Sequence, residues 1–157
     1  MIGLAFRAGA SMNIAEILER GLVQHDSSAF VADPDLIRVL IARSAAVDCA
    51  TDRVLFNQED TAVGIYILLE GSGTLTMKSR DGRTIFSIPA IAGSLLGLPA
   101  LISSQPYSLT ATANAGADVR FISRDDFLAL MQSDPLLSLK MLQVLAAEVR
   151  TARKAMY

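Results

Sequence analysis

Few side chains in this sequence could carry out covalent or acid–base chemistry. Cys49 is the only cysteine, and His25 is the only histidine, set among polar residues that indicate a solvated loop. The chain has no Cys–His pairing, no cluster of metal ligands and no glycine-rich phosphate loop. Glu59 and Asp60 could transfer protons, but they lie in the short turn "NQED". The sequence therefore predicts a protein that is not an enzyme and holds no metal or cofactor.

One stretch has the glycine and proline spacing of a ligand-binding segment. It runs from Gly93 to Ala113, "GSLLGLPALISSQPYSLTATA", inside a longer uncharged region from Thr84 to Ala117. The candidate pocket residues are Leu96, Gly97, Leu98, Pro99, Ala100, Tyr107, Ser108 and Thr110. Two alternatives stay open. Either the apolar side chains collapse inward and fill the space, or an apolar small molecule binds with a few hydroxyl groups as polar anchors.

Composition limits the partners and the compartment. The 157 residues suffice for one domain with a real core, and a net charge of −2 gives no reason to expect a nucleic-acid partner. Mean hydropathy is +0.40, which points to a buried interface or cavity beyond an ordinary core. The apolar window 85–102 contains two prolines and two glycines, so a membrane helix is not expected. No convincing signal peptide precedes Met12, which could also be the natural start, and a cytoplasmic protein is predicted.

The changes in hydrophobic period divide the chain into three parts of one domain. Residues 1–44 form a helical leader, in which Asn13 and Asp33 cap helices; the second helix is expected over "DLIRVLIARSA". Residues 45–134 contain about eight short strands, including a hairpin at Asp81–Gly82, and then a helix capped by Ser123. Residues 135–157 form a long final helix that begins at Asp134–Pro135. This order predicts an α+β fold that is mainly β.

Several segments together resemble the cyclic nucleotide-binding domain of the Crp/Fnr regulators. They are "GIYILLEGSGTLTM", the Asp–Gly hairpin, "LLGLPAL" and "FISRDDFLALM", within a similarity that covers roughly residues 45 to 157. The resemblance implies a jelly-roll-like β-roll flanked by helices, with a long last helix that usually pairs two subunits. It does not imply DNA binding through this chain alone, because the chain ends where a helix-turn-helix domain would begin. A longer natural protein stays open.

The same resemblance implies a site that this sequence lacks. In the family an arginine binds the cyclic phosphate, a glutamate binds the ribose hydroxyl, and backbone amides complete the anion site. Here Leu98 follows Gly97 at the glutamate position, and Tyr107 stands at the arginine position, with Pro106 or Ser108 as alternatives. An unpaired phosphodiester is costly to bury, and Pro99 removes one backbone donor.

Three functions stay in view. The first is a sensor or regulatory domain that does not bind cyclic AMP or cyclic GMP in the usual way. The second is a true cyclic-nucleotide-responsive regulator with an atypical phosphate site, for which Arg53 or Lys78 would have to reach the pocket. The third is a dimeric interaction scaffold without a ligand.

The final helix carries two apolar stripes. Leu142, Leu145, Val149, Ala152 and Met156 are spaced 3, 4, 3 and 4 residues apart, which is the spacing of a coiled-coil seam. A second stripe of Leu137, Met141 and Val144 could pack on the roll. A helix with two apolar faces needs two partners, so the sequence predicts a two-fold homodimer. The alternative is that both stripes cover the same core.

Overall fold

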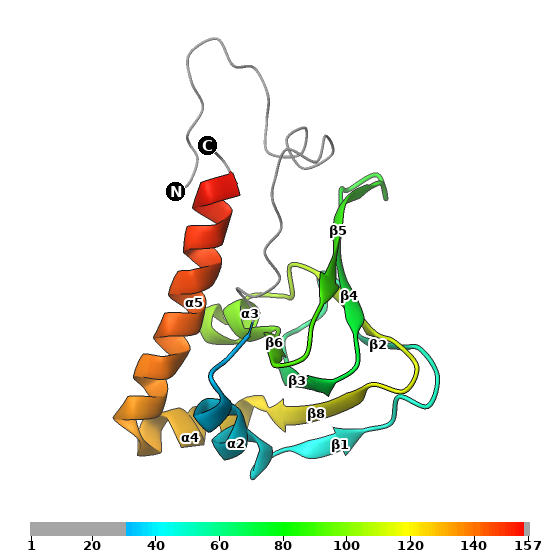
Figure 1. Ribbon diagram of the computed structural model, residues 1–157. Helices are drawn as coiled ribbons and strands as arrows, with labels where there is room; N and C mark the ends of the chain where they lie inside the picture. The colour runs from blue at the N-terminus through cyan, green and yellow to red at the C-terminus, as the bar shows by residue number, and fades with distance from the viewer. Residues whose placement is uncertain (1–30, 156–157) are drawn as a thin grey trace, which may run out of the picture.

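Two four-stranded antiparallel sheets face each other in the computed structural model, which describes residues 31–155 (Figure 1). The first sheet has the strand order β1-β8-β3-β6 and the second has the order β2-β7-β4-β5. The strands are β1 (Ala45–Val47), β2 (Arg53–Phe56), β3 (Gly64–Glu70), β4 (Gly73–Lys78), β5 (Thr84–Ala90), β6 (Ser94–Leu96), β7 (Thr110–Ala113) and β8 (Asp118–Ser123). The helices are α2 (Pro34–Ile41), α3 (Leu98–Ser103), α4 (Arg124–Ser133) and α5 (Pro135–Ala155). The predicted jelly-roll-like, mainly β architecture is confirmed.

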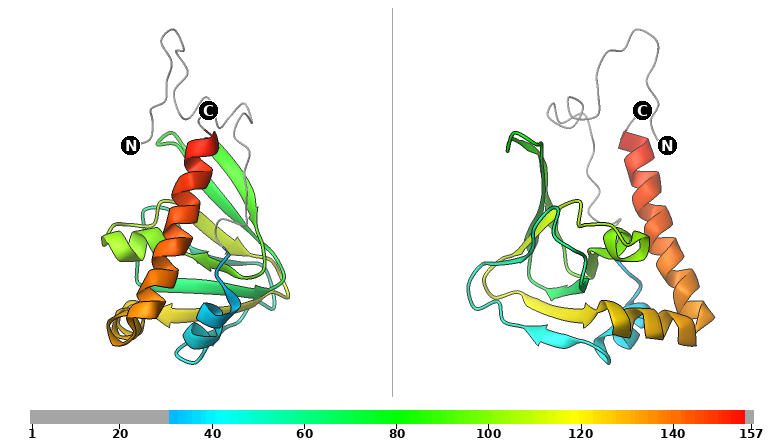
Figure 2. Two further views of the ribbon diagram at one scale, coloured as in Figure 1. Left: turned by 60° about the vertical axis from the view of Figure 1, so that its left-hand side comes forward. Right: turned by 180° about the vertical axis from the view of Figure 1, so that it is seen from behind.

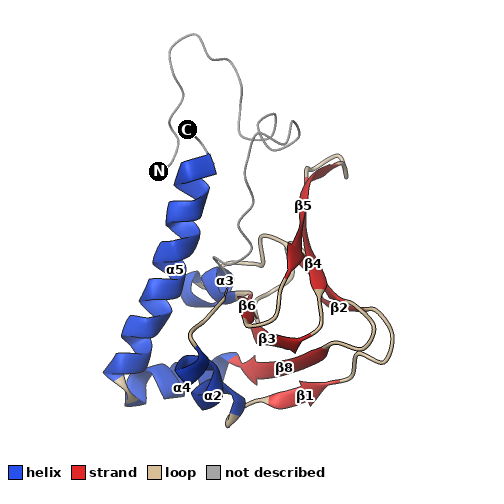
Figure 3. Ribbon diagram, viewed as in Figure 1, coloured by secondary structure: helices blue, strands red, loops and turns tan. Residues whose placement is uncertain are grey.

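The helices gather along one side of the roll (Figure 3). The β4–β5 hairpin, with its turn at Asp81–Gly82, projects on the side away from α5, as Figure 1 and the right view of Figure 2 show. Within residues 31–155, no helix is long and apolar enough to cross a membrane. The uncharged window 85–102 forms β5, β6 and part of α3 instead.

Local capping explains where the helices begin. The Asp33 carboxylate accepts a hydrogen bond from the Leu36 amide at 2.9 Å, and the Ser123 hydroxyl accepts one from the Asp126 amide at 3.2 Å. The Asp134 carboxylate likewise accepts from the Leu136 amide at 3.0 Å. These predicted helix starts are confirmed, and Asp33 also forms an ion pair with Lys140 that ties α2 to α5.

Two predictions for the N-terminal part need comment. The second helix was expected to continue to Ala45, but α2 ends at Ile41 because Ala45 and Ala46 pair with β8. The helix predicted after Asn13 and the loop around His25 lie outside the described residues. The boundaries of the three parts stay a prediction.

The core consists of two clusters. One lies inside the roll, and the other lies between the roll and the helices. The roll cluster contains Cys49, Leu55, Phe56, Ala62, Leu68, Leu75, Ile88, Ala90, Leu96, Ala100, Tyr107, Ala111, Ala113 and Val119. The helix-side cluster contains Ala32, Leu36, Leu40, Ile65, Ile67, Leu95, Leu98, Leu101, Ile122, Phe127, Leu130, Leu137, Met141 and Val144. Alternation along the strands divides them, since neighbouring side chains point to opposite faces of a sheet.

Candidate functional site

The uncharged segment forms a strand, a sharp turn and a short helix. β6 ends at Leu96, Gly97 adopts a φ of 93°, and α3 begins at Leu98. A left-handed conformation of this kind favours glycine. A Cβ atom on Gly97 would also lie 2.8 Å from Cε1 of Tyr107. The glycine therefore permits both the turn and the close approach of the tyrosine ring.

Tyr107 fills space inside the roll. Its ring stacks on Phe56 with centroids 3.8 Å apart, and only 2% of the residue is exposed. Its hydroxyl donates a 2.6 Å hydrogen bond to the Gly64 carbonyl oxygen and accepts a longer one, 3.4 Å, from the Gly64 amide. The backbone is held as well, because the Tyr107 amide donates to the Asp60 carbonyl at 2.9 Å.

The surroundings keep the Tyr107 phenol protonated. Burial is the largest cause that raises its pKa, opposed by the hydrogen bond with Gly64. A protonated phenol is able to donate to the Gly64 carbonyl, so the hydroxyl is satisfied without a ligand.

The other candidate pocket residues do not all face the same space. Leu96 and Ala100 belong to the roll cluster with Tyr107. Leu98, which is 0% exposed, belongs to the helix-side cluster and packs with residues of α2, α4 and α5.

The polar and proline candidates lie nearer the surface. Pro99 and Ser108 are exposed. Thr110 is half-buried, and its hydroxyl accepts a 2.9 Å hydrogen bond from the Gln58 amide. The hydroxyl groups of Ser108 and Thr110 are therefore not gathered with Tyr107 around one apolar space.

An arginine that the sequence did not single out lies beside this segment. Arg124, the first residue of α4, donates from Nη1 to the Leu101 carbonyl and from Nη2 to the Ser104 hydroxyl, each at 2.9 Å. It lines an open pocket of about 360 Å³ with Thr61, Ala62, Ser104, Gln105 and Pro106. Only the strand register could have indicated that Arg124 lies beside this segment. Gly64 pairs with Ser123, and this pairing brings the Arg124 amide to the Val63 carbonyl.

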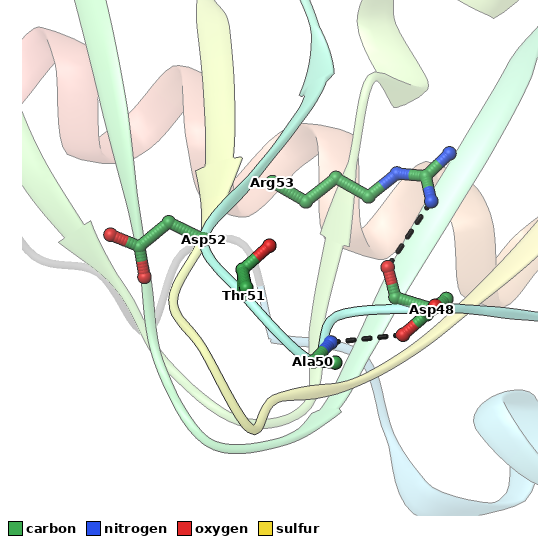
Figure 4. A pocket seen from close by; sticks show the side chains of 5 residues that line it. All are labelled: Asp48, Ala50, Thr51, Asp52 and Arg53. Carbon is green, nitrogen blue, oxygen red and sulfur yellow. Dashed lines mark hydrogen bonds between the residues drawn. The ribbon is translucent and has the colours of Figure 1, made fainter.

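The loop between β1 and β2, at the end of the roll away from α5 (Figure 1), lines a second pocket of about 310 Å³ (Figure 4). Its lining residues are Asp48, Ala50, Thr51, Asp52 and Arg53. Nη1 of Arg53 donates to the Asp48 carbonyl oxygen at 3.1 Å, and the Asp48 carboxylate accepts from the Ala50 amide at 2.9 Å. Arg53 therefore stabilises the turn between β1 and β2. Lys78 is exposed, as Arg53 is, and its backbone forms hydrogen bonds with the Gln58 side chain.

α5 presents one stripe to the core and another to solvent. Leu137, Met141 and Val144 are buried in the helix-side cluster. Leu142 and Val149 are exposed, at 60% and 45%, and Leu139 lies on the same side at 50%. Leu145 is partly buried against the helix-side cluster. The side chain of Ala152 is not described, and Met156 lies outside the described residues.

Glu148 continues the buried stripe of α5. Leu137, Met141, Val144 and Glu148 follow one another along the helix at spacings of four, three and four residues. Its Oε2 atom is buried and has no hydrogen-bond partner among the described residues. Burial raises the pKa of this carboxyl from 4.5 to about 7.

Within residues 31–155, the side chains that could carry out catalysis lie in different surroundings. Glu59 and Asp60 lie in an exposed turn, where the Asp60 carboxylate accepts from the Asn57 amide at 3.1 Å. Cys49 is buried, and burial is the main cause that raises the pKa of its thiol. No group of three or more potential metal ligands occurs in the described part of the chain.

Comparison with known proteins agrees with this geometry. A profile of the family described as the cyclic nucleotide-binding domain matches residues 47–134. No curated protein sequence matches the chain. Among solved structures, the catabolite activator protein of Thermus thermophilus is similar with a TM-score of 0.63 at 22% identity, over 75% of this chain and 55% of its own. This chain thus spans about half the length of that protein.

Two further structures share the fold. The sensor domain of the transcriptional regulator DNR from Pseudomonas aeruginosa is similar with a TM-score of 0.60 at 19% identity, over 88% of this chain and 92% of its own. The c-di-GMP-responsive global regulator CLP of Xanthomonas campestris has a TM-score of 0.62 at 19% identity, over 78% of this chain and 61% of its own. At these identities the likeness concerns the fold alone.

Proposed function

Because this chain belongs to the cyclic nucleotide-binding domain family, we propose that it is a non-catalytic sensor or regulatory domain that does not bind cyclic AMP or cyclic GMP in the family's usual way. The observation that carries the proposal is the buried Tyr107, which stands where the family resemblance puts the phosphate-binding arginine. Its ring is stacked on Phe56 and its hydroxyl is bonded to Gly64.

The energetics favour the apolar, self-filled interior. Arginine binds a phosphodiester through charge and two forked hydrogen bonds, and a hydrogen bond to a charged group contributes about 1.5–3 kcal/mol. Tyrosine brings neither the charge nor the fork, and its one hydroxyl proton is already donated to Gly64. A cyclic nucleotide would have to displace this ring and leave its own phosphate without a cation.

The glutamate role is better assigned to Leu96 than to Leu98. Leu98 follows the matching glycine in the sequence, but its side chain packs in the helix-side cluster. Leu96 shares the roll cluster with Tyr107, so a side chain at this position faces the interior where a nucleotide would lie. Neither leucine can accept a hydrogen bond from a ribose hydroxyl.

The regulatory role we propose includes a two-fold homodimer formed through α5. The exposed stripe of Leu139, Leu142 and Val149 is apolar, and the opposite stripe already packs on the roll. Pairing with a second copy would remove these side chains from water. We further propose a cytoplasmic location and no catalytic activity. CLP is described as responsive to c-di-GMP, which supports the view that this fold serves effectors of more than one kind.

The proposal is tested by restoring the missing contacts. We expect Leu96→Glu with Tyr107→Arg to bind cyclic AMP at least about tenfold more tightly than the wild type, since one charged hydrogen bond alone is worth that factor. The matched control is Leu98→Glu with Tyr107→Arg, whose carboxylate would lie among the helices and should add nothing to the affinity that Tyr107→Arg alone gives. Circular dichroism establishes that each variant is folded.

Two results would contradict the proposal. The first is a wild type that already binds cyclic AMP as tightly as the Leu96→Glu/Tyr107→Arg variant. The second is a folded variant of this pair without any gain, which would mean that these two positions do not decide nucleotide binding. Saturable binding by the wild type would favour the atypical regulator instead.

A further inference from the structure

Arg124 carries a positive charge that no carboxylate neutralises in the described part of the chain. Its guanidinium donates to two neutral acceptors, the Leu101 carbonyl and the Ser104 hydroxyl, and forms no ion pair with an aspartate or glutamate of residues 31–155. A guanidinium has five N–H donors. Three of them therefore have no partner among the described residues.

This guanidinium lines the open pocket of about 360 Å³ between two loops. Thr61 and Ala62 come from the loop between β2 and β3, and Ser104, Gln105 and Pro106 come from the loop between α3 and β7. A volume of this order suits a small organic molecule. The Thr61 hydroxyl and the Gln105 amide add neutral polar groups, whereas Ala62 and Pro106 supply apolar wall.

We infer that this pocket binds the carboxylate of a small organic acid, with Arg124 as its anchor. A planar carboxylate matches two parallel N–H groups of a guanidinium. A single arginine balances one negative charge, and the remaining lining is neutral. Asp125 and Asp126 follow in the first turn of α4, so a dianion such as sulfate or phosphate would keep an uncompensated charge near two carboxylates.

The position of the pocket links an occupant to the segment that carries Tyr107. Ser104 ends α3 in a left-handed conformation, with a φ of 56°, and two residues separate it from Tyr107. Arg124 holds both the last turn of α3 and the Ser104 hydroxyl. A carboxylate on Arg124 therefore touches the loop that positions Tyr107 without entering the roll. The inference goes beyond the proposed function, because Arg124 lines the pocket and not the roll interior, and Ala62 is the one lining residue that also belongs to the roll cluster.

Arg120 provides a matched control within the same chain. Its guanidinium is also partly buried and also bonded to a serine hydroxyl and a carbonyl, namely Ser44 Oγ at 2.9 Å and Ser44 O at 3.1 Å. It does not line the pocket. The two arginines thus have equivalent neutral partners and differ in access to the pocket.

The test is a titration of the ¹⁵N-labelled full chain with sodium acetate and sodium benzoate at constant ionic strength, followed through the arginine Nε–H signals. We expect a saturable shift of the Arg124 signal with a dissociation constant of about 1–10 mM, an affinity in keeping with one charged anchor, and no saturable shift of the Arg120 signal. Arg124→Lys should weaken benzoate binding by about tenfold, because the fork is lost. Arg120→Lys should change it less than about twofold.

A second variant keeps the test decisive if Arg124→Lys disturbs α3. Thr61→Leu places an apolar side chain into the pocket at an exposed position and leaves Arg124 in place, and it should also weaken benzoate binding. Three results would overturn the inference: no saturable shift of the Arg124 signal, tighter binding of sulfate than of acetate, or benzoate binding that survives both Arg124→Lys and Thr61→Leu. Binding of cyclic AMP that shifts the NMR signals of Phe56 and Tyr107 but not that of Arg124 would contradict the proposed function and leave this inference intact.

Discussion

The Tyr107 hydroxyl donates a 2.6 Å hydrogen bond to the carbonyl oxygen of Gly64, across the interior of the roll. The two residues are 43 positions apart in the chain and come from the segment before β7 and the start of β3. This bond joins the uncharged segment to a central strand of the first sheet. A Cβ atom on Gly64 would lie 2.4 Å from the Ile122 carbonyl oxygen, so glycine is needed here for close packing of β3 on β8.

Removing this hydroxyl should cost stability. Tyr107→Phe leaves the buried Gly64 carbonyl oxygen without its donor, and we expect a loss of about 1–2 kcal/mol in the free energy of unfolding. The control is Tyr66→Phe, because the Tyr66 hydroxyl has no hydrogen-bond partner among the described residues and its ring has similar aromatic neighbours. Urea denaturation measures both. Equal losses in the two variants would show that the Gly64 bond contributes nothing specific.

Glu59 offers a stabilising substitution. Its φ is 77°, a left-handed conformation that is costly for a residue with a Cβ atom. Glu59→Gly should raise the free energy of unfolding by about 0.5–1 kcal/mol, after the greater freedom of glycine in the unfolded chain is subtracted. Glu70→Gly, at the exposed end of β3 without a positive φ, should lower it instead. A loss of stability in Glu59→Gly would mean that the left-handed turn is not strained.

Glu148 should make stability depend on pH. Its folded pKa of about 7 lies above the ordinary 4.5, so the folded chain keeps a proton that the unfolded chain releases between these values. The stabilisation is fully present below pH 4.5 and is lost as the pH rises through 7. Glu148→Gln does not titrate and so keeps its free energy of unfolding over this range. The difference in free energy of unfolding between the variant and the wild type should therefore grow in favour of the variant, by at most about 3 kcal/mol between pH 5 and pH 8. Urea denaturation at both pH values is the measurement, with the exposed Glu70→Gln as control, and identical pH dependence of wild type and Glu148→Gln would contradict the expectation.

The exposed stripe of α5 should hold two copies together. We expect the wild type to be a dimer at tens of micromolar concentration, roughly the range of a modest apolar interface. Leu142→Glu with Val149→Glu should give a folded monomer, as measured by light scattering and circular dichroism. Val54→Glu with Val63→Glu changes two apolar residues of the roll with comparable exposure, 50% and 56%, and should leave the dimer intact. A wild-type monomer, or a dimer that survives the α5 variant, would refute this interface.

Local signals allowed the elements to be predicted well. The caps at Asp33 and Ser123 depend on one side chain and an amide three residues later, and the Asp81–Gly82 turn depends on adjacent residues. Such patterns are visible in the sequence because the interacting groups are neighbours along the chain. The end of α2 was less predictable, since it depends on the pairing of Ala45 with Phe121 in β8.

The candidate site stays a prediction, and the sequence did not indicate the directions of its side chains. The segment around Gly97 and Tyr107 was singled out by its lack of charge. Leu96 belongs to the roll cluster and Leu98 to the helix-side cluster, and this division follows from the turn at Gly97 between them. Arg124 gave no sequence signal, because its partners Leu101 and Ser104 lie 23 and 20 residues away.

Titration calorimetry of the wild type with cyclic AMP and cyclic GMP tests the central claim most directly. Our proposal rests on the buried Tyr107, which is bonded to Gly64 and stacked on Phe56 at the position where the family resemblance puts the phosphate-binding arginine. We predict no saturable heat with either nucleotide at micromolar concentration. Saturable binding with a dissociation constant below about 10 μM, roughly −7 kcal/mol, would contradict this account.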